Sequence, residues 1–146
     1  MSKLFLNIYL LFAAALLATA APDHDYTIPY EQLPEASRTF VRTHFAQAQV
    51  SYCLRDSHSF EVRFADGSEI EFHNDGSWKE IDCKYREIPA SVTALLPESI
   101  PEYVKANFPT AIITKVNKKF RGFEVELDNG LEIKFSQDGT FRKIDD

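Results

Sequence analysis

The stretch that decides the fold runs from residue 60 to residue 72 and reads FEVRFADGSEIEF. Apolar residues alternate with charged ones on both sides of Asp66-Gly67, which is the pattern of two half-buried β-strands joined by a turn. A two-residue turn would oppose Phe64 with Glu69 and mix the two faces. We therefore expect the three-residue loop 65–67, which keeps one face apolar, with Gly67 at a positive φ.

The same stretch recurs 63 residues later, where residues 123–135 read FEVELDNGLEIKF. A shift of the chain by 63 positions aligns residues 33–83 with residues 96–146 without a gap, and about a third of the aligned positions are identical. A repeat of this length indicates one supersecondary unit that occurs twice. We therefore expect a first repeat over residues 28–83 and a second over residues 84–146.

Each repeat is expected to begin with two helices. Apolar residues at helical spacing follow Ser99, and this residue with Glu102 has the pattern of a capping box. A shorter helical turn is expected after each Ile-Pro pair, at 28–29 and 88–89. Strands near 50–54 and 112–116 precede the hairpins, so the expected class is α+β: a tandem duplication of a helix-helix-four-stranded antiparallel sheet unit, with the helices on one sheet face.

A second hairpin should follow in each repeat, closed by Asp75-Gly76 and by Asp138-Gly139. Ile81 and Ile144, which end these hairpins, fall on the charged side of the alternation. A β-bulge before each isoleucine would return both side chains to the core, and we expect one in each repeat.

Residues 1–20 have the composition of an export signal. Lys3 precedes an apolar run over residues 4–17, and Ala18-Thr19-Ala20 has the small side chains of a cleavage site, with cleavage after Ala20 or Ala21 fitting equally well. A membrane anchor is the alternative, but the apolar run is short for a bilayer core of about 30 Å. We expect a flexible mature N-terminus over residues 21–27, a periplasmic or secreted location, and no membrane insertion after cleavage.

The charge of the chain and its motifs exclude several classes of function. The net charge is −6 at pH 7 and the basic residues are not clustered, which argues against nucleic-acid binding. The sequence has no phosphate-binding glycine loop, and no serine or cysteine lies in the strained turn that a nucleophile needs. We therefore expect a protein without enzymatic activity and without a cofactor.

Cys53 and Cys83 are the only cysteines. An exported protein with two cysteines favours a disulfide. However, the expected strand order places them on the first and last of four strands, about 14 Å apart at about 4.8 Å per strand, which is too far for a disulfide bond. The sequence leaves both possibilities open.

Taken with the duplication and the export signal, the repeated pattern resembles the PepSY-like family of exported bacterial proteins, whose fold is similar to that of the β-lactamase inhibitor protein. The resemblance implies tandem units whose sheets can join, and a role in binding or inhibiting another protein such as a peptidase. It does not imply inhibition of a β-lactamase. The residues that carry it are turn and core positions: Phe60-Glu61-Val62, Gly67, Glu69-Ile70, Phe72, Asp75-Gly76 and Trp78, and in the second repeat Phe123-Glu124-Val125, Asp128-Asn129-Gly130, Glu132-Ile133, Phe135 and Asp138-Gly139.

The charged face of the expected sheet is the candidate surface for an unidentified protein partner. In each repeat the expected register opposes one complementary charge pair and one Glu-Glu pair, and a like-charged pair destabilises a sheet by some tenths of a kcal/mol unless a basic partner relieves it. An ordinary solvated sheet face is the alternative. The candidate partner-binding residues are Glu61, Arg63, Glu69, Glu71, Glu124, Glu126, Glu132 and Lys134.

His58 and His73 offer an alternative function. They are expected at the ends of adjacent strands, near Asp56 and Asp75, where a small ligand or a metal ion would find imidazole and carboxylate ligands. The second repeat has no histidine at the matching positions, and the sequence has no closely spaced ligand motif. We therefore expect no metal there and keep the two histidines as weak candidates.

Overall fold

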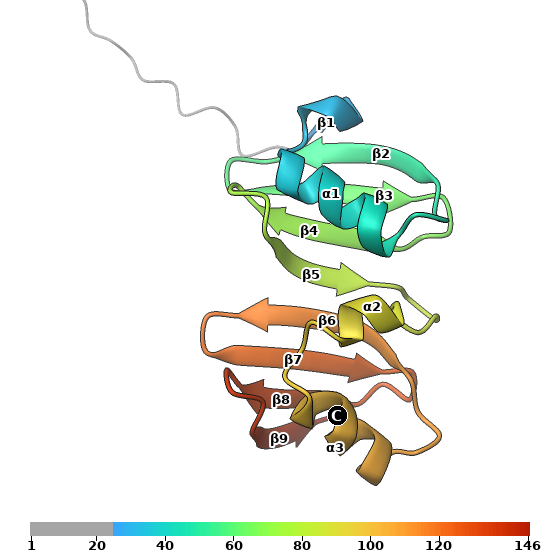
Figure 1. Cartoon of the computed structure of the whole chain (residues 1–146), viewed down its shortest axis with the longest axis vertical. Helices are drawn as coiled ribbons and strands as arrows, with labels where there is room; N and C mark the ends of the chain where they lie inside the picture. The colour runs from blue at the N-terminus through green and yellow to red at the C-terminus, as the bar shows by residue number, and fades with distance from the viewer. Residues whose placement is uncertain (1–24) are drawn as a thin grey trace, which may run out of the picture.

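One antiparallel sheet of nine strands forms the frame of the protein in the computed structural model, which describes residues 25–146 (Figure 1). The strands lie in the sheet in the order of the sequence. The export signal predicted over residues 1–20 lies outside the described residues. The strands are β1 (Tyr26–Ile28), β2 (Val50–Arg55), β3 (Ser59–Phe64), β4 (Glu69–His73), β5 (Trp78–Asp82), β6 (Ile113–Lys119), β7 (Gly122–Leu127), β8 (Glu132–Ser136) and β9 (Phe141–Asp145).

The central hairpin of each half has the predicted register. Val62 lies opposite Ile70 in the first half, and Val125 lies opposite Ile133 in the second. The amide of Phe64 donates to the carbonyl of Ser68 at 2.9 Å across the three-residue loop. Gly67 has a φ of 90°, as the loop requires. The alternation of apolar and charged residues therefore predicted this part of the fold correctly.

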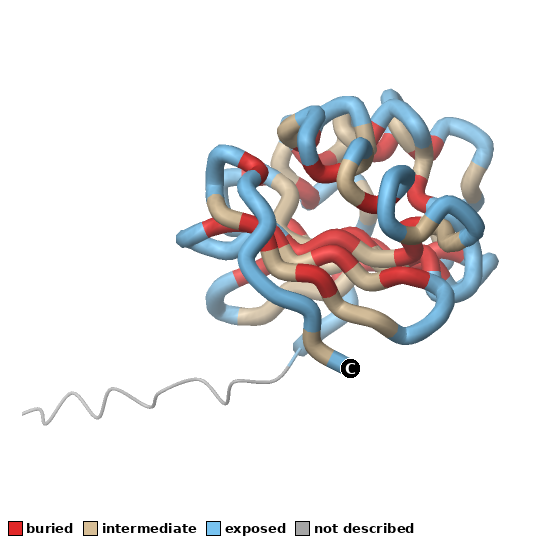
Figure 2. Tube along the Cα trace, turned by 90° about the horizontal axis from the view of Figure 1, so that it is seen from below, coloured by how far each residue is buried: buried red, intermediate tan, exposed pale blue. Residues whose placement is uncertain are grey.

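Three short α-helices and a 3-10 turn lie on one face of the sheet in the described chain (Figure 2). Apolar side chains from this face and from the helices form a single core, in which Val62, Ile70, Ile81, Val116 and Ile133 are inaccessible to solvent. Among residues 25–146, no helix lies on the opposite face of the sheet, which is called the helix-free face below. The helical elements are the 3-10 turn η1 (Tyr30–Gln32), α1 (Glu35–His44), α2 (Ala90–Thr93) and α3 (Ser99–Asn107).

The predicted fold class, an α+β repeat of two helices and four strands, is wrong. The described chain is mostly β, and its strands belong to one sheet of nine. Between Pro29 and Pro34 only a 3-10 turn forms, because proline donates no hydrogen bond and disfavours a helical residue before it. Residues 26–28 instead pair with β2 as an additional strand. Three residues are too few to show an alternating pattern in the sequence.

Both predicted bulges are present, but they bury only one of the two isoleucines. The register shifts by one residue before Ile81 in β5 and before Ile144 in β9. Ile81 is fully buried, because β6 continues the sheet beyond β5, whereas Ile144 is 38% exposed on the edge strand β9. The sequence predicts the sheet face on which a side chain lies, but not whether a neighbouring strand covers it.

The sheet is continuous across the junction of the two halves. Strand β5 pairs with β6, with Ile81 opposite Val116 and Asp82 opposite Lys115. The indole of Trp78 lies near this seam, with the ammonium group of Lys118 at 5.6 Å from its ring centre. The two halves therefore share backbone hydrogen bonds as well as a core.

The start of a helix packs against the Asp-Gly turn in each half. The hydroxyl of Ser37 donates to the carbonyl of Gly76 at 3.0 Å, and the hydroxyl of Ser99 donates to that of Gly139 at 2.9 Å. The predicted capping role of Ser99 is therefore wrong: Ser99 is the first residue of α3, its hydroxyl bonds to the turn, and Glu98 occupies the cap position without a side-chain bond.

Candidate partner-binding surface

The eight charged residues predicted to face a partner all lie on the sheet face that carries no helix. Arg63 lies opposite Glu69, and Glu61 opposite Glu71, as the register requires. In the second half, Glu124 lies opposite Lys134 and Glu126 opposite Glu132. The predicted juxtaposition of charges is therefore present, and the surrounding strands decide how strongly each charge is compensated.

In the first half, each carboxylate of the Glu61–Glu71 pair has a cation of its own. The Arg63 Nε lies 2.5 Å from Glu61, and the Lys79 Nζ lies 2.6 Å from Glu71. Arg63 also reaches Glu69 at 3.2 Å. Burial nevertheless raises the pKa of Glu61, against the opposing effect of Arg63. The repulsion expected between the two glutamates is thus largely relieved within the chain.

The second half compensates its charges through shared cations. Lys134 lies within 3.7 Å of Glu124, 3.2 Å of Glu132 and 3.0 Å of Asp145. Lys119 also lies 3.4 Å from Glu124, and Lys143 lies 2.9 Å from Asp145. Among residues 25–146, no cation lies within ion-pair distance of Glu126, but Lys115 lies opposite it on β6 and interacts with its charge.

The seam contributes charged residues that the sequence reasoning did not single out. Lys115 bridges Glu80 at 2.9 Å and Asp82 at 4.0 Å, and the Asn117 side-chain amide donates to Glu80 at 2.5 Å. The alternation of side chains places these residues on the charged face. Their contacts with one another could be predicted only if β5 were known to pair with β6. The face is a continuous mixed-charge surface rather than an acidic one.

Two hollows on this face are small. Their volumes are about 110 Å³, beside Glu61 and Arg63, and about 240 Å³, beside Asn117 and Glu126. Pockets for small ligands usually measure about 300–1,000 Å³ and are mostly apolar. The geometry suits contact with another macromolecular surface.

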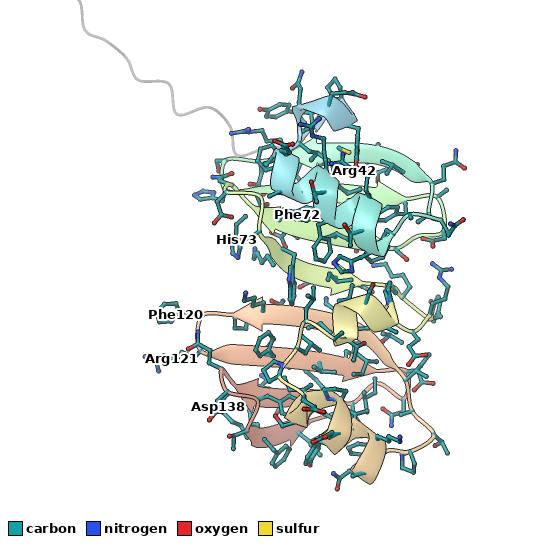
Figure 3. All side chains as sticks on the ribbon, viewed as in Figure 1. Arg42, Phe72, His73, Phe120, Arg121 and Asp138 are labelled. Carbon is teal, nitrogen blue, oxygen red and sulfur yellow. The ribbon has the colours of Figure 1, made fainter. Side chains whose placement is uncertain are left out.

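The β6–β7 turn presents an aromatic side chain that the sequence reasoning missed. Phe120 and Arg121 form the two-residue tip of this hairpin, and Phe120 is 93% exposed. Figure 3 shows both side chains at the end of the strands, on the same rim as His73 and Asp138. Phe141 and Arg142 line the same broad, open depression. The signal was available: an aromatic residue between Lys118-Lys119 and Arg121-Gly122, in the connection between the strand expected near 112–116 and the one that follows it.

Gly122 fixes this hairpin close to β8. A Cβ at Gly122 would lie 1.9 Å from the carbonyl oxygen of Phe135, so no other residue fits there. The backbone immediately after Phe120-Arg121 is therefore held against the sheet, and the tip projects from a well-defined base.

The matching turn of the first half is closed by its own side chains. One carboxylate oxygen of Asp56 accepts from the amides of His58 and Ser59, each at 2.6 Å. The His58 Nδ1 lies 2.6 Å from the hydroxyl of Ser57, and His73 lies opposite Ser59. Within residues 25–146, no cluster of three or more acidic, histidine or cysteine side chains has the geometry of a metal site. The two histidines thus lie near each other without forming a ligand set.

Cys53 and Cys83 are both buried and both have free thiols. Cys53 lies on β2 and Cys83 directly follows β5, with β3 and β4 between them. Burial raises the pKa of Cys53 to about 11 and also raises that of Cys83. Both thiols therefore stay protonated at neutral pH and act as small core side chains.

Comparison with known proteins gives a consistent picture. A family model described as "Putative beta-lactamase-inhibitor-like, PepSY-like" matches residues 21–63 and 58–143. A structure from Bacteroides thetaiotaomicron, described as a "putative calcium-regulated periplasmic protein", has a TM-score of 0.78 and 32% identity over 84% of this chain and 97% of its own. No curated protein matches the chain.

Two structures from Bacteroides vulgatus are similar to the same degree. One, described as a periplasmic protein of unknown function, has a TM-score of 0.77 and 36% identity over 84% of this chain and 100% of its own. The other, a periplasmic protein of the DUF2874 family, has a TM-score of 0.78 and 35% identity over 86% of this chain and 100% of its own. Neither description names a catalytic activity.

These comparisons also bear on location. All three similar structures are described as periplasmic. Among the described residues, no helix has the length and apolar character needed to span a bilayer. The predicted periplasmic or secreted location is confirmed. The match of the family model over both halves of the sheet, together with these structures, shows that the chain belongs to the PepSY-like, β-lactamase-inhibitor-like family.

Proposed function

We propose that this protein is an exported, non-catalytic binding module that contacts a protein partner through its helix-free sheet face and the Phe120 hairpin tip. Residues 1–20 would serve as the signal peptide, and residues 28–83 and 84–146 as the two repeats. The observation that carries the proposal is Phe120, whose ring is 93% exposed at the tip of a hairpin whose base packs closely against β8. This contact inhibits or regulates the partner, in keeping with the inhibitor-like description of the family.

Phe120 has the properties of an interface anchor. Aromatic residues and arginine contribute most of the binding energy in protein interfaces, and both occur at this tip. An exposed phenylalanine gains about 2 kcal/mol when it enters an apolar pocket. Arg121 and the neighbouring lysines favour a pocket bordered by carboxylates. The partner is therefore expected to offer an apolar pocket with an acidic rim.

The sheet face would supply the periphery of the same interface. Most of its charged side chains are joined by ion pairs of 2.5 to 3.7 Å, which would reduce the side-chain entropy lost when a partner binds. Exposed charge pairs contribute little affinity but orient and select partners. Glu126, which has no ion pair among the described residues, is expected to meet a cation of the partner.

Capture of partners from the native periplasmic fraction tests this proposal with matched variants. Phe120→Ala should reduce the amount of the retained partner at least tenfold, whereas Tyr85→Ala, which removes a ring that is 94% exposed at the opposite rim, should leave it unchanged. Equal loss in both variants, or in neither, would contradict the role of Phe120.

The sheet face is tested separately. Glu126→Lys combined with Glu132→Lys should weaken capture severalfold, and Glu35→Lys combined with Glu102→Lys makes the same charge change on exposed helix positions. Retention that depends only on the total charge, and falls equally in the two double variants, would argue against a specific role of the sheet face.

The alternative, a small ligand or metal ion at the His58/His73 rim, has less support. Asp56 is already occupied by backbone amides, and one neighbour is described as calcium-regulated without any matching ligand cluster in the described part of this chain. Thermal melts with zinc and with calcium distinguish the two functions, because an ion that binds only the folded state raises the midpoint. A rise that His58→Ala and His73→Ala abolish would favour the alternative.

A further inference from the structure

The two edges of the sheet differ in how well they are protected. Strand β1 has three residues and is followed by Pro29, which cannot donate a hydrogen bond to another strand. Strand β9 has five residues and no proline, and it leaves Phe141 and Ile144 40% and 38% exposed. Among the described residues no strand lies beyond β9 (Figure 1). An uncovered edge of this kind is a template for a further strand.

The backbone of Ile144 is oriented toward this free edge. The amide of Ser136 donates to the carbonyl of Thr140 at 2.8 Å, which makes this a hydrogen-bonded pair. Hydrogen-bonded and non-hydrogen-bonded pairs alternate along an antiparallel ladder, and the bulge adds its extra residue on β9 only. Along β8, Ser136 and Lys134 are therefore in hydrogen-bonded pairs, and Phe135 and Ile133 are in non-hydrogen-bonded ones. Ile133 lies opposite Ile144, so these two form a non-hydrogen-bonded pair. The N–H and C=O of Ile144 therefore point away from β8.

The charges of β9 are complementary to those of a second β9. Lys143 precedes Ile144 and Asp145 follows it; on the helix-free face Lys143 is exposed and Asp145 half-buried. Within one chain, Asp145 lies 2.9 Å from Lys143 and 3.0 Å from Lys134. In an antiparallel pair of two β9 strands centred on Ile144, each Lys143 lies opposite Asp145 of the other copy. The two isoleucines meet on the helix side, where each now contacts solvent.

Other registers of the same pair are unfavourable. A shift by two residues places Lys143 opposite Lys143, or Asp145 opposite Asp145, and like charges directly opposite are destabilising. A shift by one residue places apolar side chains opposite charged ones. A lysine on an edge strand usually prevents pairing, but here the lysine has a complementary carboxylate in one register only.

We propose that two copies of this chain associate through β9, in an antiparallel pair centred on Ile144, and thereby extend the sheet across a two-fold axis. Each copy presents the same segment to the other, so the contact is closed and does not continue into a fibre. The pairing leaves both helix-free faces on the same side of the extended sheet. The inference does not depend on the proposed binding of another protein.

Sedimentation over a range of concentrations tests the pairing, with charge reversals that determine the register. The wild type should change from the mass of one chain to the mass of two. Lys143→Glu and Asp145→Lys should each raise the dissociation constant about tenfold or more, because each replaces two attractive pairs with two repulsive ones. A mixture of the two variants should regain the dimer, since each mixed pair has two attractive contacts. Lys105→Glu, on an exposed position of α3, is the matched control.

Each other outcome would overturn the proposal. These outcomes are a wild type that stays monomeric up to about millimolar concentration, far above the range of specific dimers, single variants that dimerise like the wild type, and a mixture that stays monomeric. A different protein bound at this edge would be lost from both single variants and not recovered on mixing, which would also contradict self-association. Thermal melts of every variant verify that the fold is retained.

Discussion

The two halves of the sheet share their central hairpins and the contact between a helix and the Asp-Gly turn, but they differ at one rim and at one edge. In the first half, Asp56 closes the rim turn and β1 covers β2. In the second half, Phe120 projects from the rim, and no strand of the described chain pairs with the outer edge of β9. The shared features are those that the fold requires. The features present in only one half are therefore the better candidates for function.

The largest expected difference between the halves concerns two isoleucines at matching positions. Ile81→Ala should lower the free energy of unfolding by about 3 kcal/mol, because it leaves a cavity beside Val116 in the seam. Ile144→Ala should lower it by less than about 1 kcal/mol, since this side chain is already partly exposed. Urea denaturation of both variants measures the difference, and equal losses would contradict the account of the seam.

Substitutions in the Asp-Gly turns should destabilise the two halves equally. A Cβ at Gly76 would lie 2.8 Å from the Cβ of Pro34, and one at Gly139 would lie 2.6 Å from that of Pro97. Alanine at either position should cost about 2–3 kcal/mol, from a positive φ and from overpacking. Alanine at Gly67, where the space is open, should cost about 1 kcal/mol from backbone strain alone. Thermal denaturation ranks the three variants.

The serine hydroxyls beneath these turns should contribute less. Ser37→Ala leaves a carbonyl of the first half without its donor in a fully buried site, at an expected cost of about 1–2 kcal/mol. Ser99→Ala, at a partly buried site, should cost about 0.5–1 kcal/mol. Reversible melts of the two variants measure the order, and a larger loss for Ser99→Ala would indicate that the second contact is the more important.

The smallest expected effect is a change in folding stability at acidic pH. The hydroxyl of Ser136 and the amide of Thr140 lower the pKa of Asp138 to about 2, from an ordinary value of 3.8. A lowered pKa stabilises the fold above the unfolded value, and this contribution is lost as the pH falls from about 4 toward 2. Between about pH 5 and pH 2.5, the midpoint temperature of thermal unfolding should therefore fall less for Asp138→Asn than for the wild type. An identical pH dependence in the two proteins would rule out this contribution.

Local patterns predicted the hairpins, the registers and the bulges, because each depends on residues close together in the sequence. They did not predict that β5 pairs with β6 or that residues 26–28 form β1. The residue pattern of a strand does not indicate which distant strand pairs with its edge. The same limit applies to the surface. The charged residues were placed on the correct face, but their compensation by Lys79, Lys115 and Lys134 depends on which strands are neighbours.

The pairing of β5 with β6 also sets the order of assembly. The turns within each half close loops of a few residues at an entropic cost of about 1 kcal/mol, whereas joining Asp82 to Lys115 closes about thirty residues and costs about 3 kcal/mol. The seam should therefore form after the hairpins within each half, as should the β1–β2 pair, which closes about 25 residues. The only tryptophan, Trp78, lies near this seam. Its fluorescence should therefore change in a refolding phase that is slower than hairpin formation.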